Sequence, residues 1–265
     1  MYKLFVTYKD FNINHAIVDF KQFAGGEWNV KLPKDVIEYG AYEADTVRVD
    51  ASIHDGDIMK LAILTDALHR FFGTGVRYVL DLSYLPYARQ DRVMAVGESL
   101  SLRVFCDFIN SMKYDLVCLT DPHSDVATAL INNVFVNKQC CWGSQGISRR
   151  NYDAIVSPDA GALKKIYPQA QSAGLPVIEA MKTRDINTGE VSEPRFNADV
   201  KGKRLLIVDD ICDGGRSFLN LGKVLKESGA VRVDLFVTHG IFSYNAKENL
   251  AQYIDNVYTR FDWTK

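Results

Sequence analysis

Short runs of β-branched residues alternate with segments of helical period along most of the chain. This alternation predicts an α/β fold of mainly parallel sheets covered by helices, because parallel neighbours are usually joined through a crossover helix. The expected strands are residues 3–8, 16–22, 28–32, 46–52, 76–82, 115–120, 133–137, 153–157, 175–180, 204–209, 231–238 and 255–259. The expected helices are residues 56–72, 98–112, 123–132, 159–167, 216–228 and 244–253. The opening part, rich in strands and poor in helix, indicates antiparallel hairpins.

Two stretches of the chain are similar to each other. "VRYVLDLSYLPYARQD" and "VKGKRLLIVDDICDGG" each contain a strand that ends in a polar loop before a helix. A chain of 265 residues is also long for one hydrophobic core. We therefore predict two related α/β domains, residues 1–142 and 143–265. The polar residues 183–201 are expected to form a mobile loop beside the second stretch.

Composition excludes several classes of protein. The chain is 47% hydrophobic and 24% charged with a net charge of −2, which gives no reason to expect nucleic-acid binding. The first residues lack the apolar core of a signal peptide, and no apolar run is long enough for a membrane helix. The five cysteines are odd in number and lack paired CxxC spacing, so they indicate neither a disulfide framework nor a zinc site. We expect a cytoplasmic protein that binds neither membranes nor nucleic acid.

The stretch "VDDICDGGRS", residues 208–217, joins carboxylates to a glycine-rich turn. In open α/β sheets, ligands bind beyond the carboxyl ends of the strands. Glycines at 214 and 215 allow an anion to approach the backbone, and the following helix supplies N–H donors. Carboxylates repel phosphate, so Asp209 and Asp210 would instead accept hydrogen bonds from a diol or hold a divalent cation indirectly. A phosphorylated sugar satisfies both halves, and an acidic N-cap is the alternative interpretation.

Two further polar loops each contain one candidate residue. "SPDAGALKK", residues 157–165, places Asp159 at a turn before small residues that permit close approach. "LTDPHSD", residues 119–125, places His123 between two carboxylates. A single histidine beside carboxylates is a weak metal signal, since a lone histidine is more often a capped or surface residue.

Cations gather in two other segments. "LPYARQDR", residues 85–92, follows a strand with two arginines and a glutamine, which suits a polyphosphate or an adenine edge. A solvated turn is the alternative. "EAMKTRD", residues 179–185, offers Lys182 and Arg184, which could close over developing negative charge.

Four motifs together resemble a known family. "PYARQDR", "VSPDAGALKK", "KGKRLLIVDDICD" and "VTHGIFS" occur in the order and spacing of the ribose-phosphate diphosphokinases, also called phosphoribosyl-pyrophosphate synthetases. The resemblance covers residues 20–258. It implies two phosphoribosyltransferase-type domains, each a mainly parallel sheet flanked by helices, with an N-terminal β-hairpin. It also implies a homodimer or higher homo-oligomer that uses Mg²⁺ to transfer the β,γ-diphosphate of ATP to the anomeric hydroxyl of a ribose phosphate, releasing AMP.

The resemblance assigns roles to particular residues. The implied ATP-binding residues are Phe23, Glu27, Arg89, Gln90 and Asp91. The implied magnesium-linked residues are His123 and Asp159, and the implied catalytic cations are Lys182 and Arg184. The implied sugar-phosphate residues are Asp209, Asp210, Asp213, Gly214, Gly215, Arg216 and Ser217. Because the hairpin with Phe23 and Glu27 reaches a neighbouring subunit in this family, an active site near a subunit interface is implied.

The chain departs from the family pattern in two places. The family continues its acidic loop as Thr-x-Gly-Thr, where this chain has Gly214, Gly215, Arg216 and Ser217. A side chain is lost at 214 and a cation is gained at 216, which would suit a larger acceptor such as ADP-ribose. The alternative is drift in a loop that still holds ribose 5-phosphate. There is also too little chain before the hairpin for the helix that the family has there.

Several functions therefore remain open. The acceptor is ribose 5-phosphate or ADP-ribose, with phosphoribosyl pyrophosphate or ADP-ribose pyrophosphate as the product. The product would serve nucleotide or NAD biosynthesis. A phosphoribosyltransferase and a non-catalytic regulatory homologue are the alternatives. The first would leave "PYARQDR" without a role, and the retained Lys182 and Arg184 argue against the second.

Overall fold

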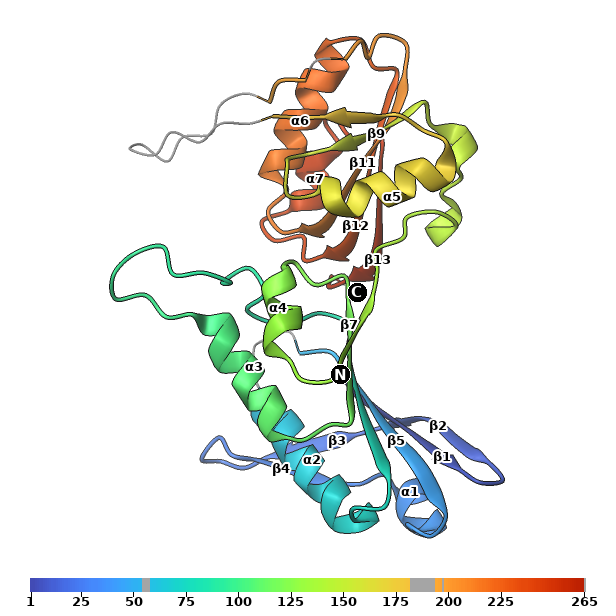
Figure 1. Cartoon of the computed structure of the whole chain (residues 1–265), viewed down its shortest axis with the longest axis vertical. Coiled ribbons are helices and arrows are strands. Elements are labelled where there is room, and N and C mark those ends of the chain that lie inside the picture. The colour runs from blue at the N-terminus through green and yellow to red at the C-terminus, as the bar shows by residue number, and fades with distance from the viewer. Residues whose placement is uncertain (54–57, 182–193, 197, 265) are drawn as a thin grey trace. The chain divides into compact units, whose positions relative to one another are not determined.

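A computed structural model describes residues 1–53, 58–181, 194–196 and 198–264. The chain forms two compact units, Met1–Asn137 and Lys138–Lys265 (Figure 1). Each unit is an α/β structure with a mainly parallel sheet, so the predicted fold class is confirmed. The division comes before the predicted break at 142 because Gln139 and Trp142 hydrogen-bond to residues of the second unit.

The first unit contains a six-stranded sheet of order β2-β1-β5-β6-β7-β8. β1 is antiparallel to both of its neighbours, and β5 to β8 are parallel. The strands are β1 (Tyr2–Tyr8), β2 (Asn12–Ile17), β5 (Ala44–Ala51), β6 (Arg77–Leu82), β7 (Leu116–Thr120) and β8 (Val134–Asn137). The helices are α1 (Lys34–Tyr39), α2 (Ile58–Phe72), α3 (Ser101–Ser111) and α4 (Asp125–Leu130).

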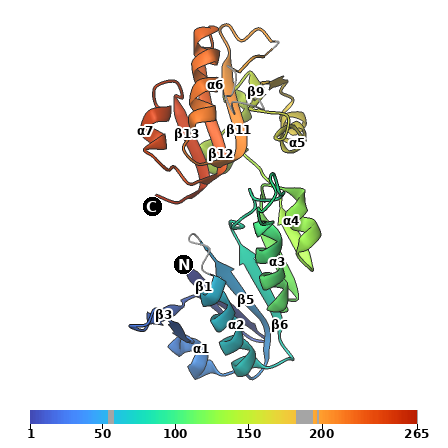
Figure 2. The same ribbon diagram turned by 90° about the vertical axis from the view of Figure 1, so that its left-hand side faces the viewer.

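The helices α2, α3 and α4 lie on one face of this sheet (Figures 1 and 2). Alternate residues of β1 are buried in the core beneath them, namely Tyr2, Leu4, Val6 and Tyr8. The opposite face carries Arg48 ion-paired with Asp81. Parallel sheets are usually covered on both faces. The segment between β1 and the hairpin was expected to be too short for the helix that the resembled family has there. This segment forms the strand β2.

The second unit contains an all-parallel sheet of order β10-β9-β11-β12-β13. Its strands are β9 (Ala154–Ser157), β10 (Val177–Glu179), β11 (Arg204–Cys212), β12 (Arg232–Gly240) and β13 (Asn256–Asp262). Its helices are α5 (Leu163–Ala173), α6 (Arg216–Glu227) and α7 (Ala246–Leu250), with 3₁₀ turns η1 (Ser144–Gly146) and η2 (Arg149–Asn151).

Successive residues of the central strands in this unit enter two separate cores. Leu205 and Ile207 of β11 pack in the core that includes α6 and α7, whereas Leu206 and Val208 pack in the core that includes α5. Because successive side chains on a strand point to opposite faces, α5 covers one face of the sheet and α6 covers the other. This double burial explains the nearly continuous apolar run "LLIV".

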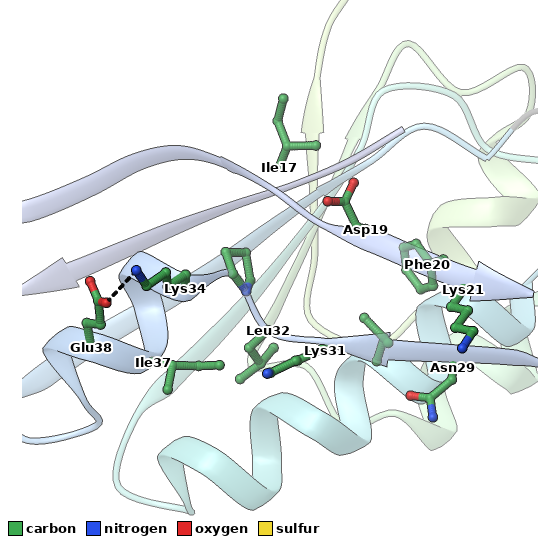
Figure 3. A pocket seen from close by; sticks show the side chains of 12 residues that line it. Ile17, Asp19, Phe20, Lys21, Asn29, Lys31, Leu32, Lys34, Ile37 and Glu38 are labelled. Carbon is green, nitrogen blue, oxygen red and sulfur yellow. Dashed lines mark ion pairs between the residues drawn. The ribbon is translucent and has the colours of Figure 1, made fainter.

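A hairpin of β3 (Asp19–Gln22) and β4 (Trp28–Lys31) stands apart from both sheets. β4 packs on α2, where the Lys60 ammonium lies 4.0 Å from the centre of the Trp28 ring. Figure 3 shows the groove between the hairpin and α1. The groove has a volume of about 1020 Å³ and is lined by apolar side chains, by lysines and by Asp19, Asn29 and Glu38. Among the described residues, no helix is both long enough and apolar enough to cross a membrane.

Two local expectations were wrong, and one helix was missed. The strand expected over 16–22 is divided at Val18 between β2 and β3. The helix α1 was not expected. The helix expected from 159 begins at Leu163, because the preceding residues form a turn closed by the Asp159 side chain.

Candidate active site

The acidic loop begins inside a strand. Asp209 and Asp210 are near the end of β11, and the Asp210 N–H donates to Asp209 Oδ1 at 2.9 Å. Asp210 is 6% exposed and its Oδ2 lies 3.0 Å from Lys165 Nζ on α5. Asp209 is half-buried. One carboxylate of the pair therefore has a fixed cation beside it, and the other lies next to a backbone donor.

The electrostatics of Asp209 favour a ligand that brings donors or positive charge. Burial raises the pKa of Asp209 well above its ordinary value, and the negative charge of Asp210 raises this pKa further. The charge of Asp159 also raises it, while the N–H of Asp210 and the ammonium of Lys165 lower it. Sugar hydroxyls or a divalent cation would stabilise the ionised form, so this group is suited to bind them.

The turn that follows β9 places Asp159 in the same neighbourhood. Asp159 Oδ1 accepts hydrogen bonds from the backbone N–H groups of Gly161 and Ala162, at 3.0 and 3.2 Å. Ser157 Oγ donates to the Asp159 carbonyl at 2.8 Å. β9 and β11 are adjacent and parallel, so their carboxyl ends bring Asp159 and Asp209 together.

The glycine turn connects β11 to α6. Gly215 has a φ of 73° and caps α6, and a Cβ at this position would lie 3.3 Å from the Leu250 side chain. The left-handed backbone therefore favours glycine at 215, and a Cβ there would make a tight contact with the Leu250 side chain. At Gly214 a Cβ would meet only the Tyr244 ring at 3.5 Å, an ordinary contact, so packing does not require glycine there.

The first turn of α6 faces solvent. Arg216 and Ser217 are its first two residues and both are exposed. The N–H groups of a first helical turn have no partner within the helix and carry the positive end of the helix dipole. Such N–H groups suit an anion, and the binding of a sugar phosphate here stays a prediction.

Two of the polar loops in the first unit meet beyond β6 and β7. Arg89 and Gln90 are exposed in the loop after β6. The neighbouring Asp91 accepts a hydrogen bond from Arg92 Nε at 3.0 Å, and this bond lowers the pKa of Asp91. Burial raises that pKa, while a hydrogen bond from Ser124 and the charge of His123 lower it. The structure thus brings the "RQD" loop and His123 together.

The two hairpin residues are exposed. Phe23 and Glu27 occupy the turn between β3 and β4, where the Phe23 N–H donates to the Glu27 carbonyl at 2.9 Å. Lys21 Nζ lies 5.3 Å from the centre of the Phe23 ring. Phe23 is 48% exposed, which is high for an aromatic ring and leaves it available for contact with a ligand or another chain.

Two of the predicted site residues, the proposed catalytic cations Lys182 and Arg184, lie outside the described residues. Just before them, Met181 forms an isolated antiparallel bridge with Arg195. The expected mobile loop over 183–201 lies largely outside the described residues as well.

The donor set fits magnesium held through its substrates. Within the described ranges, no three His, Cys, Asp or Glu side chains form a group able to hold a metal ion. Mg²⁺ usually binds through one or two carboxylates together with substrate phosphates, so a complete protein cage is not needed. Asp159, whose Oδ1 accepts hydrogen bonds from two backbone N–H groups, is an oxygen donor of this kind.

Three residues around the acidic loop were not predicted. Lys165 stands within "SPDAGALKK", yet only the structure distinguishes it from the exposed Lys164. Gln139 donates to the Asp209 carbonyl, and Gln169 donates to Gln139. These glutamines lie far from the loop in sequence, so no local motif could have identified them.

The geometry defines a class of protein. Two α/β units, each with a mainly parallel sheet flanked by helices, form the phosphoribosyltransferase type of fold, and comparisons with known proteins narrow this class. Residues 7–112 match the N-terminal domain of ribose phosphate pyrophosphokinase, and residues 167–259 match the phosphoribosyl synthetase-associated domain.

Individual proteins agree with these matches. The ribose-phosphate pyrophosphokinase of Pyrococcus furiosus is 30% identical over 91% of this chain and 84% of its own length. That of Mycobacterium leprae is 27% identical over 92% of this chain and 75% of its own. The crystal structure of phosphoribosylpyrophosphate synthetase from Mycobacterium smegmatis matches with a TM-score of 0.75 and 27% identity, over 91% of this chain and 78% of that one. The chain belongs to the ribose-phosphate pyrophosphokinase family.

Proposed function

We propose that the protein is an ATP-dependent ribose-phosphate pyrophosphokinase that makes phosphoribosyl pyrophosphate from ribose 5-phosphate. The observation that carries this proposal is the group of Asp209, Asp210 and Lys165 beside the glycine turn of α6. That arrangement offers acceptors for the sugar hydroxyls and N–H donors for the 5-phosphate. Family membership supports the same activity.

The reaction requires positioning and charge neutralisation rather than a protein nucleophile. The anomeric oxygen of the sugar attacks the β-phosphorus of ATP and loses its proton. The bond between this phosphorus and the oxygen that bridges to the α-phosphate breaks, and AMP leaves with that oxygen. Asp209 and Asp210 hold the sugar so that its anomeric hydroxyl is oriented for attack.

The remaining predicted residues are proposed to bind magnesium, the transferring diphosphate and ATP. Mg²⁺, when bound, neutralises the charge of the phosphates, and Asp159 and His123 are its proposed contacts. Lys182 and Arg184 are proposed to stabilise the transferring diphosphate. The proposed ATP contacts are Arg89, Gln90 and Asp91, together with Phe23 and Glu27 from a second copy of the chain in a homo-oligomer.

A second acceptor, ADP-ribose, is favoured by two features of the turn before α6. Packing does not require glycine at 214, and Arg216 projects its charge from the exposed start of α6. Both features would serve an acceptor whose 5-phosphate carries a further group. The product would then be ADP-ribose pyrophosphate.

The acceptor is tested by measuring AMP release from ATP and Mg²⁺ with each sugar separately. We expect turnover with ribose 5-phosphate. Faster turnover with ADP-ribose would establish the second acceptor, and a Gly214→Thr/Arg216→Gly variant should then shift the preference toward ribose 5-phosphate. Pyrophosphate release that depends on a nucleobase and not on ATP would identify a phosphoribosyltransferase instead. Binding without turnover would identify a regulatory homologue.

A further inference from the structure

We infer that the buried side chains of Gln139 and Gln169 form a chain of hydrogen bonds, called the relay, that positions Asp209 and Asp210 for the sugar. These two aspartates are called the acidic step. Neither glutamine belongs to a motif that marks the site, and both are buried, with 9% and 6% of their surfaces exposed. The expected effect of the relay on sugar binding rests on the proposed function. Its expected effect on the conformation of residues 205–217 is independent of that function.

Gln139 joins two adjacent strands at the acidic step. β11 and β12 pair at Asp209 and Val237 and again at Ile211 and His239. Within this interval, Gln139 Nε2 donates to the Asp209 carbonyl at 2.6 Å and to the Thr238 hydroxyl at 3.3 Å. The side-chain amide therefore holds the backbone at Asp209, directly before Asp210.

The orientation of both amides is determined by their partners. The Asp209 carbonyl can only accept, so the group of Gln139 that faces it must be the NH₂. Gln139 Oε1 then accepts from Gln169 Nε2 at 2.9 Å, and Gln169 Oε1 accepts from the Cys141 backbone N–H at 2.8 Å. Each link fixes the next, which makes a directed chain from Cys141 to Asp209.

The helix α5 carries both supports of the acidic step. Gln169 lies one turn after Lys165, and Gln169 Nε2 also donates to the Lys165 carbonyl at 3.1 Å. Lys165 Nζ pairs with the Asp210 carboxylate at 3.0 Å. α5 thus holds the Asp210 side chain directly and the Asp209 backbone through Gln139. Removing Gln139 takes away one hydrogen bond to the Asp209 carbonyl, and removing Gln169 takes away the donor that orients Gln139. Both changes leave the Lys165 ammonium in place.

Three variants test the relay. Gln139→Met and Gln169→Met keep side-chain length and remove the amide. Gln145→Met is the control, because Gln145 is an exposed amide that bonds the backbone of a strand at Thr259 of β13, which β12 separates from β11. Amide hydrogen exchange of residues 205–217 and steady-state kinetics are measured for each variant and for the wild type.

We expect faster exchange over residues 205–217 in both relay variants and unchanged exchange there in the control. We also expect the KM for ribose 5-phosphate to rise roughly tenfold, the effect typical of residues that orient binding groups, with the KM for ATP unchanged. Since both glutamines act through one chain, the double variant should raise this KM no further than Gln139→Met does.

Unchanged exchange over 205–217 in folded relay variants would overturn the inference, as would equal rises of both KM values. If Gln139→Met does not fold, Gln169→Met decides the question by the same two measurements. If the wild type turns over no ribose 5-phosphate, the proposed function fails. The exchange experiment still decides whether the relay positions the loop.

Discussion

At the scale of single residues, Asp209 lowers the stability of the folded protein, and the same residue is proposed to bind the sugar. Its pKa is raised by burial and by the neighbouring carboxylates Asp210 and Asp159. Between its unfolded and folded pKa values, the folded protein keeps a proton that the unfolded chain releases. The stability therefore falls as pH rises through this interval, so the carboxyl group of Asp209 lowers the stability of the ligand-free protein at neutral pH. Binding sites commonly retain such destabilising groups.

We predict that Asp209→Asn melts at a higher temperature than the wild type at pH 7. Asparagine cannot ionise, so the difference should vanish below about pH 4, where the wild-type aspartate is protonated in both states. The same variant should lose roughly 10- to 100-fold in kcat/KM for ribose 5-phosphate, because a charged acceptor is replaced by a neutral one. Thermal melts across pH and steady-state assays check both effects. A lower melting temperature at pH 7 would contradict the assignment.

Lys165 supplies a second prediction. Lys165→Met leaves the buried Asp210 carboxylate without the ammonium at 3.0 Å, and we expect a loss of about 2 kcal/mol in the free energy of unfolding. The exposed neighbour gives the control, since Lys164→Met should change this free energy by less than about 0.5 kcal/mol. Denaturant melts measure both values. Equal effects of the two substitutions would show that the Asp210 contact is unimportant.

At the scale of elements, the two glycines of the turn before α6 have different roles. The backbone conformation favours glycine at 215, whereas neither conformation nor packing demands it at 214. Gly215 has a left-handed backbone, and a Cβ there would lie 3.3 Å from the Leu250 side chain, whereas Gly214 has room for a Cβ. We predict that Gly215→Ala costs about 1–2 kcal/mol of stability and that Gly214→Ala costs much less. Urea melts of the two variants check the difference. A larger loss at 214 than at 215 would contradict this description of the turn.

Elements and polar loops could be predicted from sequence because each depends on local patterns. The strand "LLIVDD" and the helix after Gly215 show their type in a few adjacent residues. The start of α5 could not be predicted, because it depends on Asp159 bonding its own turn. The Gln139 contact with Asp209 spans 70 positions, and such a pairing leaves no periodic signal.

At the scale of the whole molecule, the two units have separate hydrophobic cores. One core lies within residues 1–137, and two lie within residues 138–265 on either side of the second sheet. We predict that residues 138–265 expressed alone fold cooperatively, because their sheet is covered on both faces from within. A single thermal transition and a dispersed NMR spectrum would support this. An unfolded fragment would show that the second unit depends on the first.

The central claim is that the acidic step beside the turn of α6 holds a ribose phosphate for diphosphate transfer from ATP. To test this, the protein is incubated with ATP and Mg²⁺, with ribose 5-phosphate, with ADP-ribose or without an acceptor, and AMP is measured together with the sugar product. We expect AMP and phosphoribosyl pyrophosphate in equal amounts only when ribose 5-phosphate is present, and roughly 10- to 100-fold less at subsaturating sugar with Asp209→Asn. The absence of AMP with ribose 5-phosphate and with ADP-ribose, from a folded protein, would contradict it.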